Sequence, residues 1–152
     1  MEHLYGHKIT INGETRVLYH KVRFRYEEID AKVKQAVSEL KWNGIKRTYG
    51  DEWTYLIQQF GFTSASIVRQ ERLQWFNRQM HNKLTEKEDK GLWDDLDIYW
   101  LLKRLKDETC ELLEAISIHR TKGSNREEII REAADVANFA MMIADNARRL
   151  PK

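Results

Sequence analysis

The sequence contains few of the residues that cross-link a chain or interrupt its helices. It has one cysteine, Cys110, one proline, Pro151, and seven glycines. A single cysteine cannot form an internal disulfide, and 152 residues are enough to bury a core without one. The lack of disulfides indicates a reducing compartment, so we expect a cytoplasmic protein. The scarcity of proline and glycine leaves long stretches free to be helical.

Long apolar runs and an excess of charge of one sign are also absent. No run of about eighteen apolar residues and no signal-like apolar segment occurs, so we expect no membrane partner. The formal net charge is +2, with 33% of the residues charged. Such a mixed surface lacks the strongly basic patch that non-specific nucleic-acid binding requires, and no nucleic-acid partner is expected. Residues 1–152 are predicted to form a single domain.

The first sixty or so residues predict a short β-hairpin followed by helices. Asn12-Gly13 is typical of a tight hairpin turn, and the segment 21–26 alternates basic with apolar or aromatic residues, as an exposed strand does. A helix is predicted from Glu27 to about Leu40. A short helix capped by Asp51 is predicted to run through Phe60. We interpret 1–62 as an N-terminal elaboration.

The remainder of the chain, 63–150, predicts a helical core. Thr63 or Ser64 can cap a helix that ends at the charged segment 85–91. A second helix is predicted from about Asp95 to His119, a turn at 121–125, and a last helix from about Arg126 to Arg149. The predicted fold class is therefore mainly α, a helical bundle with a short N-terminal β-hairpin.

Two of these predicted helices carry matched pairs of acidic residues. Glu108 and Glu111 lie three residues apart, and Glu132 and Asp135 repeat that spacing. At about 100° of rotation per residue, Glu108 lies roughly 60° from the apolar centre of its helix, and Glu132 falls inside the apolar stripe of the last helix. A carboxylate in an apolar stripe is costly unless it is paired or bound to a metal.

If the two helices pack antiparallel across the short turn, the four acids meet and repel one another unless divalent cations neutralise them. Ligands that are all oxygen favour Mg²⁺, or Mn²⁺, over Zn²⁺. The absence of a Glu-x-x-His spacing argues against a di-iron site. The alternative is that Glu132 is an edge residue whose carboxylate reaches solvent or pairs with a lysine.

The acids and their surroundings resemble the all-α nucleoside triphosphate pyrophosphohydrolases, the superfamily that includes MazG, dimeric dUTPase and dCTPase relatives. The family pattern is E-E-x-x-E, a gap, then E-x-x-D; here it reads Asp107-Glu108-x-x-Glu111 and Glu132-x-x-Asp135. The segments FNRQMHNKLTEKEDKGLW and YWLLKRLKDETCELLEAI also look like the lead-in helix, loop and first metal helix of the family. The resemblance covers roughly 68–148. It departs at Asp107, which is one methylene shorter than the usual glutamate.

The resemblance implies a MazG-like bundle that binds Mg²⁺ through Glu108, Glu111, Glu132 and Asp135. The implied reaction is hydrolysis of a (d)NTP between its α- and β-phosphates, giving a nucleoside monophosphate and pyrophosphate, with Glu108 and Glu111 also catalytic. The apolar helix faces and the resemblance together predict a homo-oligomer, a dimer or a tetramer. The candidate substrate contacts, each of which also has a purely structural explanation, are Lys83, Lys90, Trp93, Asn138 and Asp145.

Two other functions remain open on the sequence. The chain can be a catalytically silent helical module for binding or regulation, with the basic residues Lys21, Arg23 and Arg25 facing a partner. It can also be a pyrophosphohydrolase of a modified nucleotide such as phosphoribosyl-ATP, because that neighbouring family shares the metal chemistry.

Overall fold

The computed structural model describes residues 3–42, 51–86 and 92–150. The chain divides into two compact units, Met1–Arg72 and Leu73–Lys152, which we call unit 1 and unit 2. Most of the described residues are helical, with a small sheet near the N-terminus, as predicted at that level of detail. No helix in the described ranges combines the length and apolar character needed to cross a membrane. The expectation of a single domain with a border near residue 62 stays a prediction; the border between the compact units falls ten residues later.

The N-terminal hairpin of unit 1 is confirmed. Strand β1, Tyr5–Ile11, pairs antiparallel with β2, Glu14–His20. Asn12 and Gly13 connect them with φ angles of 49° and 83°, the positive pair that the tight turn requires. A short third strand, β3, Thr63–Ser64, pairs with β2 and was not predicted, because two residues carry no alternating pattern.

The alternating segment 21–26 does not continue the strand, and the prediction made from it was wrong. Helix α1, Tyr26–Trp42, begins at once, and the Glu28 carboxylate accepts a hydrogen bond from the Arg25 backbone N–H at 2.7 Å. That contact is half of a capping box, so the local hydrogen bonds lead into a helix and override the alternation.

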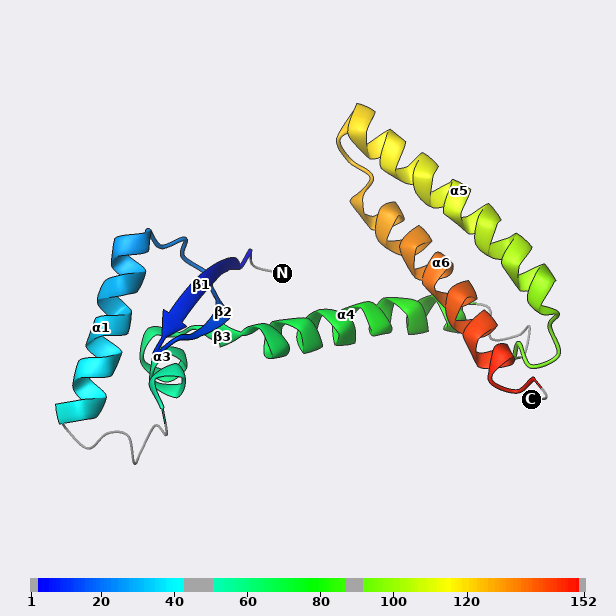
Figure 1. The fold of residues 1–152 in the computed structure, drawn as a ribbon. Helices are drawn as coiled ribbons and strands as arrows, with labels where there is room; N and C mark the ends of the chain where they lie inside the picture. Colours follow the sequence, from blue (N-terminus) through cyan, green and yellow to red (C-terminus); the bar gives the residue numbers. More distant parts are fainter. Residues whose placement is uncertain (1–2, 43–50, 87–91, 151–152) are drawn as a thin grey trace. The chain divides into compact units, whose positions relative to one another are not determined.

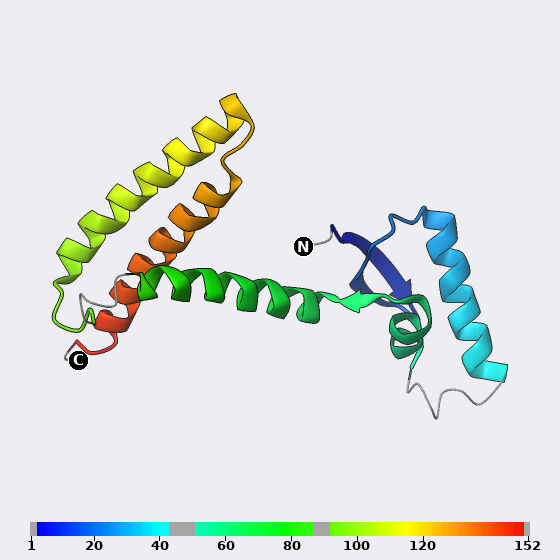
Figure 2. The ribbon, with the colours of Figure 1, turned by 180° about the vertical axis from the view of Figure 1, so that it is seen from behind.

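Helices α1 and α3 pack on one face of the sheet in unit 1. Helix α3, Glu52–Phe60, is capped by Asp51, whose carboxylate accepts from the Thr54 N–H at 2.8 Å, and it ends at Gly61, whose φ is 69°, both as predicted. Figures 1 and 2 show β1 and β2 side by side from opposite directions. The core lies between the sheet and the two helices; its buried side chains are those of Ile9, Ile11, Leu18, Ala36, Leu40, Trp53, Tyr55, Leu56 and Phe62.

Helix α4, Ala65–Thr85, begins in unit 1 and ends in unit 2. Ser64, one of its two predicted caps, accepts a long hydrogen bond of 3.4 Å from the Ile67 N–H. In unit 2 the chain then forms α5, Ile98–Lys122, and α6, Arg126–Ala147. These two helices lie side by side and run in opposite directions (Figure 1).

The turn between α5 and α6 is fixed from both sides. Gly123 has a φ of 78° and its N–H donates to the His119 carbonyl at 2.9 Å. The Asn125 side chain donates to the Ala115 carbonyl at 3.1 Å. At the other end, Asp97 caps α5 through the Trp100 N–H at 3.0 Å, and the helix begins at Ile98, three residues after the predicted start. The short turn brings the acid-bearing halves of the two helices together.

The described interior of unit 2 is mainly polar. Its buried apolar side chains are those of Leu101, Ala115 and Ala134, whereas its buried polar ones are those of Lys83, Glu108, Glu132, Asp135, Asn138 and Asn146. On α5, the line that is covered runs through Leu101, Glu108 and Ala115. The predicted apolar centre of α5 therefore lies about 60° away from the buried side of the helix. Glu108 is on the buried side itself.

Candidate metal centre

Three of the four predicted metal ligands come together between α5 and α6. Glu108, Glu111 and Glu132 each offer one carboxylate oxygen, and these oxygens all lie within 4.8 Å of one another. The exposed fraction is 3% for Glu108 and 8% for Glu132, while Glu111 is exposed. We call these residues the acidic triad. Two of its carboxylates are inside the protein and the third faces solvent.

Glu132 is the triad member with an unmet hydrogen-bonding need. Its Oε2 atom is buried and has no hydrogen-bond partner among the described residues. Burial raises the pKa of this carboxyl above its ordinary value, and the negative charges of Asp135 and Glu111 raise it further. A buried carboxylate oxygen that lacks a donor is the kind of group that a bound cation would satisfy.

Glu108 is already paired with a basic residue of its own helix. Arg104 donates from Nη2 to Glu108 Oε1 at 2.6 Å and from Nη1 to Asp107 Oδ2 at 3.0 Å. Its guanidinium also lies over the Phe139 ring, 5.6 Å from the centroid. Arg104 was not predicted as a site residue, although its position four residues before Glu108 is the spacing of a helical ion pair.

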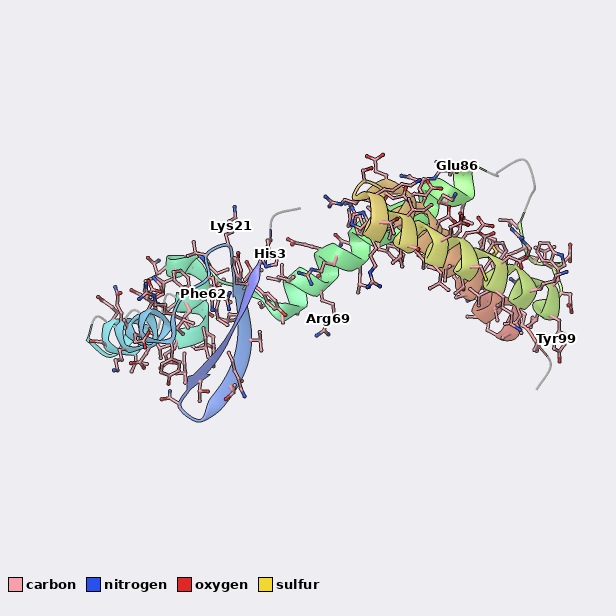
Figure 3. All side chains as sticks on the ribbon, turned by 90° about the horizontal axis from the view of Figure 1, so that it is seen from above. His3, Lys21, Phe62, Arg69, Glu86 and Tyr99 are labelled. Carbon is pink, nitrogen blue, oxygen red and sulfur yellow. The ribbon has the colours of Figure 1, made fainter. Side chains whose placement is uncertain are left out.

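Asp135, the fourth predicted ligand, lies outside the acidic triad. Its Oδ2 is 2.7 Å from the Nζ of Lys83 on α4, and both side chains are 9% exposed. Burial alone would lower the pKa of Lys83, but the hydrogen bond and the charge of Asp135 outweigh it and raise that pKa. Lys83 was predicted to contact substrate; here it neutralises Asp135. Its second acidic neighbour, Glu86, at 3.6 Å, is labelled at the end of α4 in Figure 3.

Asn138 follows Asp135 by about one helical turn and also faces α4. Its amide donates to the Met80 carbonyl at 3.0 Å, and its Oδ1 is buried with no hydrogen-bond partner among the described residues. The amide nitrogen thus has a structural role. The oxygen retains the capacity to accept from another group.

Two more of the predicted substrate contacts meet at the far end of α6. The Trp93 indole N–H donates to Asp145 at 3.0 Å, and Asp145 also pairs with Arg148 at 2.7 Å and with Arg149. The Asn146 amide donates to the carbonyls of Trp93 and Leu96. Thirteen residues separate Glu132 from Asp145, or about 20 Å along a helix. These contacts fasten the segment before α5 to α6 and lie away from the acidic triad.

A hollow of about 510 Å³ occupies the same end of the helix pair. Its lining includes Asp97, Tyr99 and Asn146, and Tyr99 is labelled at the start of α5 in Figure 3. Ile98 also lines it and precedes Glu108 by ten residues, or about 15 Å of helix. The hollow is therefore separate from the acidic triad. Lys90, the remaining predicted contact, lies outside the described residues.

Searches of protein-family models, of curated proteins and of solved structures find no match to this chain. The donor set itself fits a hard divalent cation, because the triad supplies only carboxylate oxygens from two rigid helices. The buried, partnerless Oε2 of Glu132 agrees with that fit.

Proposed function

We propose that the protein is a Mg²⁺-dependent nucleotide pyrophosphohydrolase that hydrolyses a (d)NTP between its α- and β-phosphates. The observation that carries the proposal is the buried Glu132 carboxylate, which meets Glu108 and Glu111 and leaves one oxygen without a donor. A lysine partner, the structural alternative for Glu132, is taken instead by Asp135. The match of the acids to the spacing of the MazG-like superfamily supports the same function.

In this proposal Glu108, Glu111 and Glu132 hold the metal. Bound Mg²⁺ supplies stabilisation of the charge on the phosphates and a lower pKa for a coordinated water. Asp135 was predicted as a fourth ligand, but its Oδ2 is already paired with Lys83. Mn²⁺, which accepts the same oxygen ligands, is expected to substitute.

The proposed reaction consumes one water. Water adds to the α-phosphorus, and the bond between the α-phosphorus and the oxygen that bridges it to the β-phosphorus breaks. Pyrophosphate departs with the bridging oxygen, and the nucleoside monophosphate is the second product. Glu111 is the solvent-facing member of the triad and is therefore the carboxylate best placed to take the proton of the water. Glu108 and Glu132, both buried, would hold the metal from the protein side.

The test is a panel of (d)NTPs, with phosphoribosyl-ATP included, incubated with the purified protein and Mg²⁺ in ¹⁸O-labelled water. We expect pyrophosphate release from at least one nucleotide, with ¹⁸O found in the monophosphate and not in the pyrophosphate. Release from phosphoribosyl-ATP alone would favour the modified-nucleotide alternative. No release from any member of the panel would overturn the proposal in favour of the silent binding module.

A further inference from the structure

Arg104 contacts three side chains, and only one of them belongs to the acidic triad. Its Nη2 is bonded to the triad member Glu108, its Nη1 to Asp107 outside the triad, and its planar face lies over Phe139. The Arg104 side chain is 35% exposed, whereas that of Glu108 is 4% exposed. The guanidinium thus reaches the buried carboxylate from the solvent side.

A divalent cation and the guanidinium compete for the same carboxylate. Like charges a few ångströms apart repel strongly in a partly buried site, so a cation at Glu108 weakens the bond from Nη2. The bond from Nη1 to Asp107 and the contact with Phe139 do not involve the triad and persist. Arg104 would then keep its position, while its Nη2 loses the hydrogen bond to Glu108 and is free to donate to another group beside the acidic triad.

We propose that Arg104 binds the substrate triphosphate. Asp107 and Phe139 keep Arg104 beside the acidic triad, and Glu108 releases Arg104 when it binds the metal. This inference rests on the proposed function. A guanidinium edge matches two phosphate oxygens, and it offsets the repulsion that a triphosphate meets beside several carboxylates. Asp107 becomes a positioning residue, and the shorter side chain at this point of the motif serves to hold Arg104.

The proposal predicts effects of opposite sign on two ligands in one variant. Arg104→Gln removes the competitor for Glu108, so Mg²⁺ should bind as tightly as before or more tightly. Inorganic tripolyphosphate, titrated into the Mg²⁺-saturated protein, should bind about tenfold more weakly, as expected for a lost charge-assisted hydrogen bond. Both affinities are measured by isothermal titration calorimetry. Lys103→Gln, which removes the same charge from an exposed neighbour, is the matched control and should change neither.

Kinetics with a nucleotide that the wild type hydrolyses separate positioning from general damage. Arg104→Gln and Asp107→Asn should raise KM more than they lower kcat, and Arg104→Lys, which keeps the charge and loses the fork, should give an intermediate KM. Circular dichroism melting checks that each variant is folded; if Arg104→Gln unfolds, Arg104→Lys carries the calorimetric test.

Three results would overturn the inference: tripolyphosphate affinity within twofold of wild type in the Arg104 variant, an equal loss in Lys103→Gln, or weaker Mg²⁺ binding in Arg104→Gln. A wild-type protein that hydrolyses nucleotides but does not bind tripolyphosphate also overturns it and leaves the proposed function intact. Failure of the wild type to bind Mg²⁺ or to hydrolyse any nucleotide removes both.

Discussion

Three of the four predicted metal ligands are buried, and they differ in whether a basic side chain pairs with them. Glu108 is paired with Arg104 and Asp135 with Lys83. Glu132 is also buried, but among the described residues it has no basic partner, and its carboxyl pKa is raised. A buried carboxyl whose pKa is raised by burial and by neighbouring negative charges is a candidate functional group.

Replacement of Glu132 by glutamine tests this directly. Glu132→Gln keeps the volume and removes one charge from the acidic triad, so turnover should be nearly abolished while the apo protein is as stable as wild type or more so. Pyrophosphate release and the apo melting temperature are measured on the same preparation. Glu114→Gln on α5, where Glu114 is exposed, should change neither quantity. An active Glu132→Gln enzyme would exclude Glu132 as a required metal ligand.

The raised pKa of Glu132 also fixes the sign of a pH effect. The folded state holds this proton more tightly than the unfolded chain does, so Glu132 favours folding at acid pH, and the contribution is lost as pH rises through the folded pKa. The stability gained by Glu132→Gln should therefore be present at neutral pH and absent below the ordinary glutamate pKa. Thermal melts of apo wild type and variant between those limits measure it.

The Lys83–Asp135 ion pair should stabilise the fold, whereas the charge of Glu132 should destabilise it. Lys83→Met leaves Asp135 buried, charged and close to Glu132, so we expect the free energy of unfolding to fall by about 3 kcal/mol. Lys83→Met combined with Asp135→Leu removes both charges and should recover most of that loss. Urea denaturation of the metal-free proteins gives both values. Equal stability of Lys83→Met and wild type would show that the pair contributes little to folding.

At the scale of secondary-structure elements, the network around Asp145 separates a structural from a substrate-binding role. The Trp93 N–H, followed by the charges of Arg148 and Arg149, lowers the Asp145 pKa, so its contribution to folding is present above the ordinary aspartate pKa and is lost as pH falls through the lowered one. Asp145→Asn should lower the melting temperature at neutral pH and shift Trp93 fluorescence. The KM for nucleotide should not change; a rise without loss of stability would restore Asp145 as a substrate contact.

The elements were predictable to the extent that their signals are local. Asp51 and Gly61 bound α3, and Asn12-Gly13 connects β1 to β2, because caps and tight turns depend on a few adjacent residues. Strand β3 exists only because β2 lies beside it. No local pattern could have predicted it.

The candidate site shows the same limit. The matched spacing of acids on two helices predicted that Glu108, Glu111 and Glu132 converge, and they do. The partner of Asp135 was not predicted, because Lys83 lies on α4, more than fifty residues earlier in the chain. Spacing within a helix shows which side chains share a face. It does not show which basic side chain of a neighbouring helix contacts that face.

At the scale of the whole molecule, the apolar side of α5 bears on the predicted homo-oligomer. Leu102, Leu113 and Ile116 lie on the side that was predicted as its apolar centre, and they are exposed, Leu113 by 62%. We expect light scattering to give a dimer or a tetramer at micromolar concentration, because burial of such side chains stabilises association by roughly 25 cal/mol per Å². Leu113→Glu should shift the mass toward the monomer. A wild-type monomer would contradict the prediction.

The two compact units give a final prediction about where in the chain a metal acts. All three acids of the triad belong to unit 2, whereas the hydrophobic core cluster of Ile9, Leu18 and Leu56 belongs to unit 1. A ligand stabilises the folded state that binds it, and local opening reactions gain that protection only where they disrupt the site. Mg²⁺ should therefore slow amide hydrogen exchange in peptides covering 104–112 of α5 and 129–139 of α6, and leave the hairpin peptides of 5–20 unchanged. Glu132→Gln should abolish the protection and Glu114→Gln should retain it. Equal slowing of exchange in the hairpin and in the triad peptides, or no slowing in either, would argue against a metal site at the acidic triad.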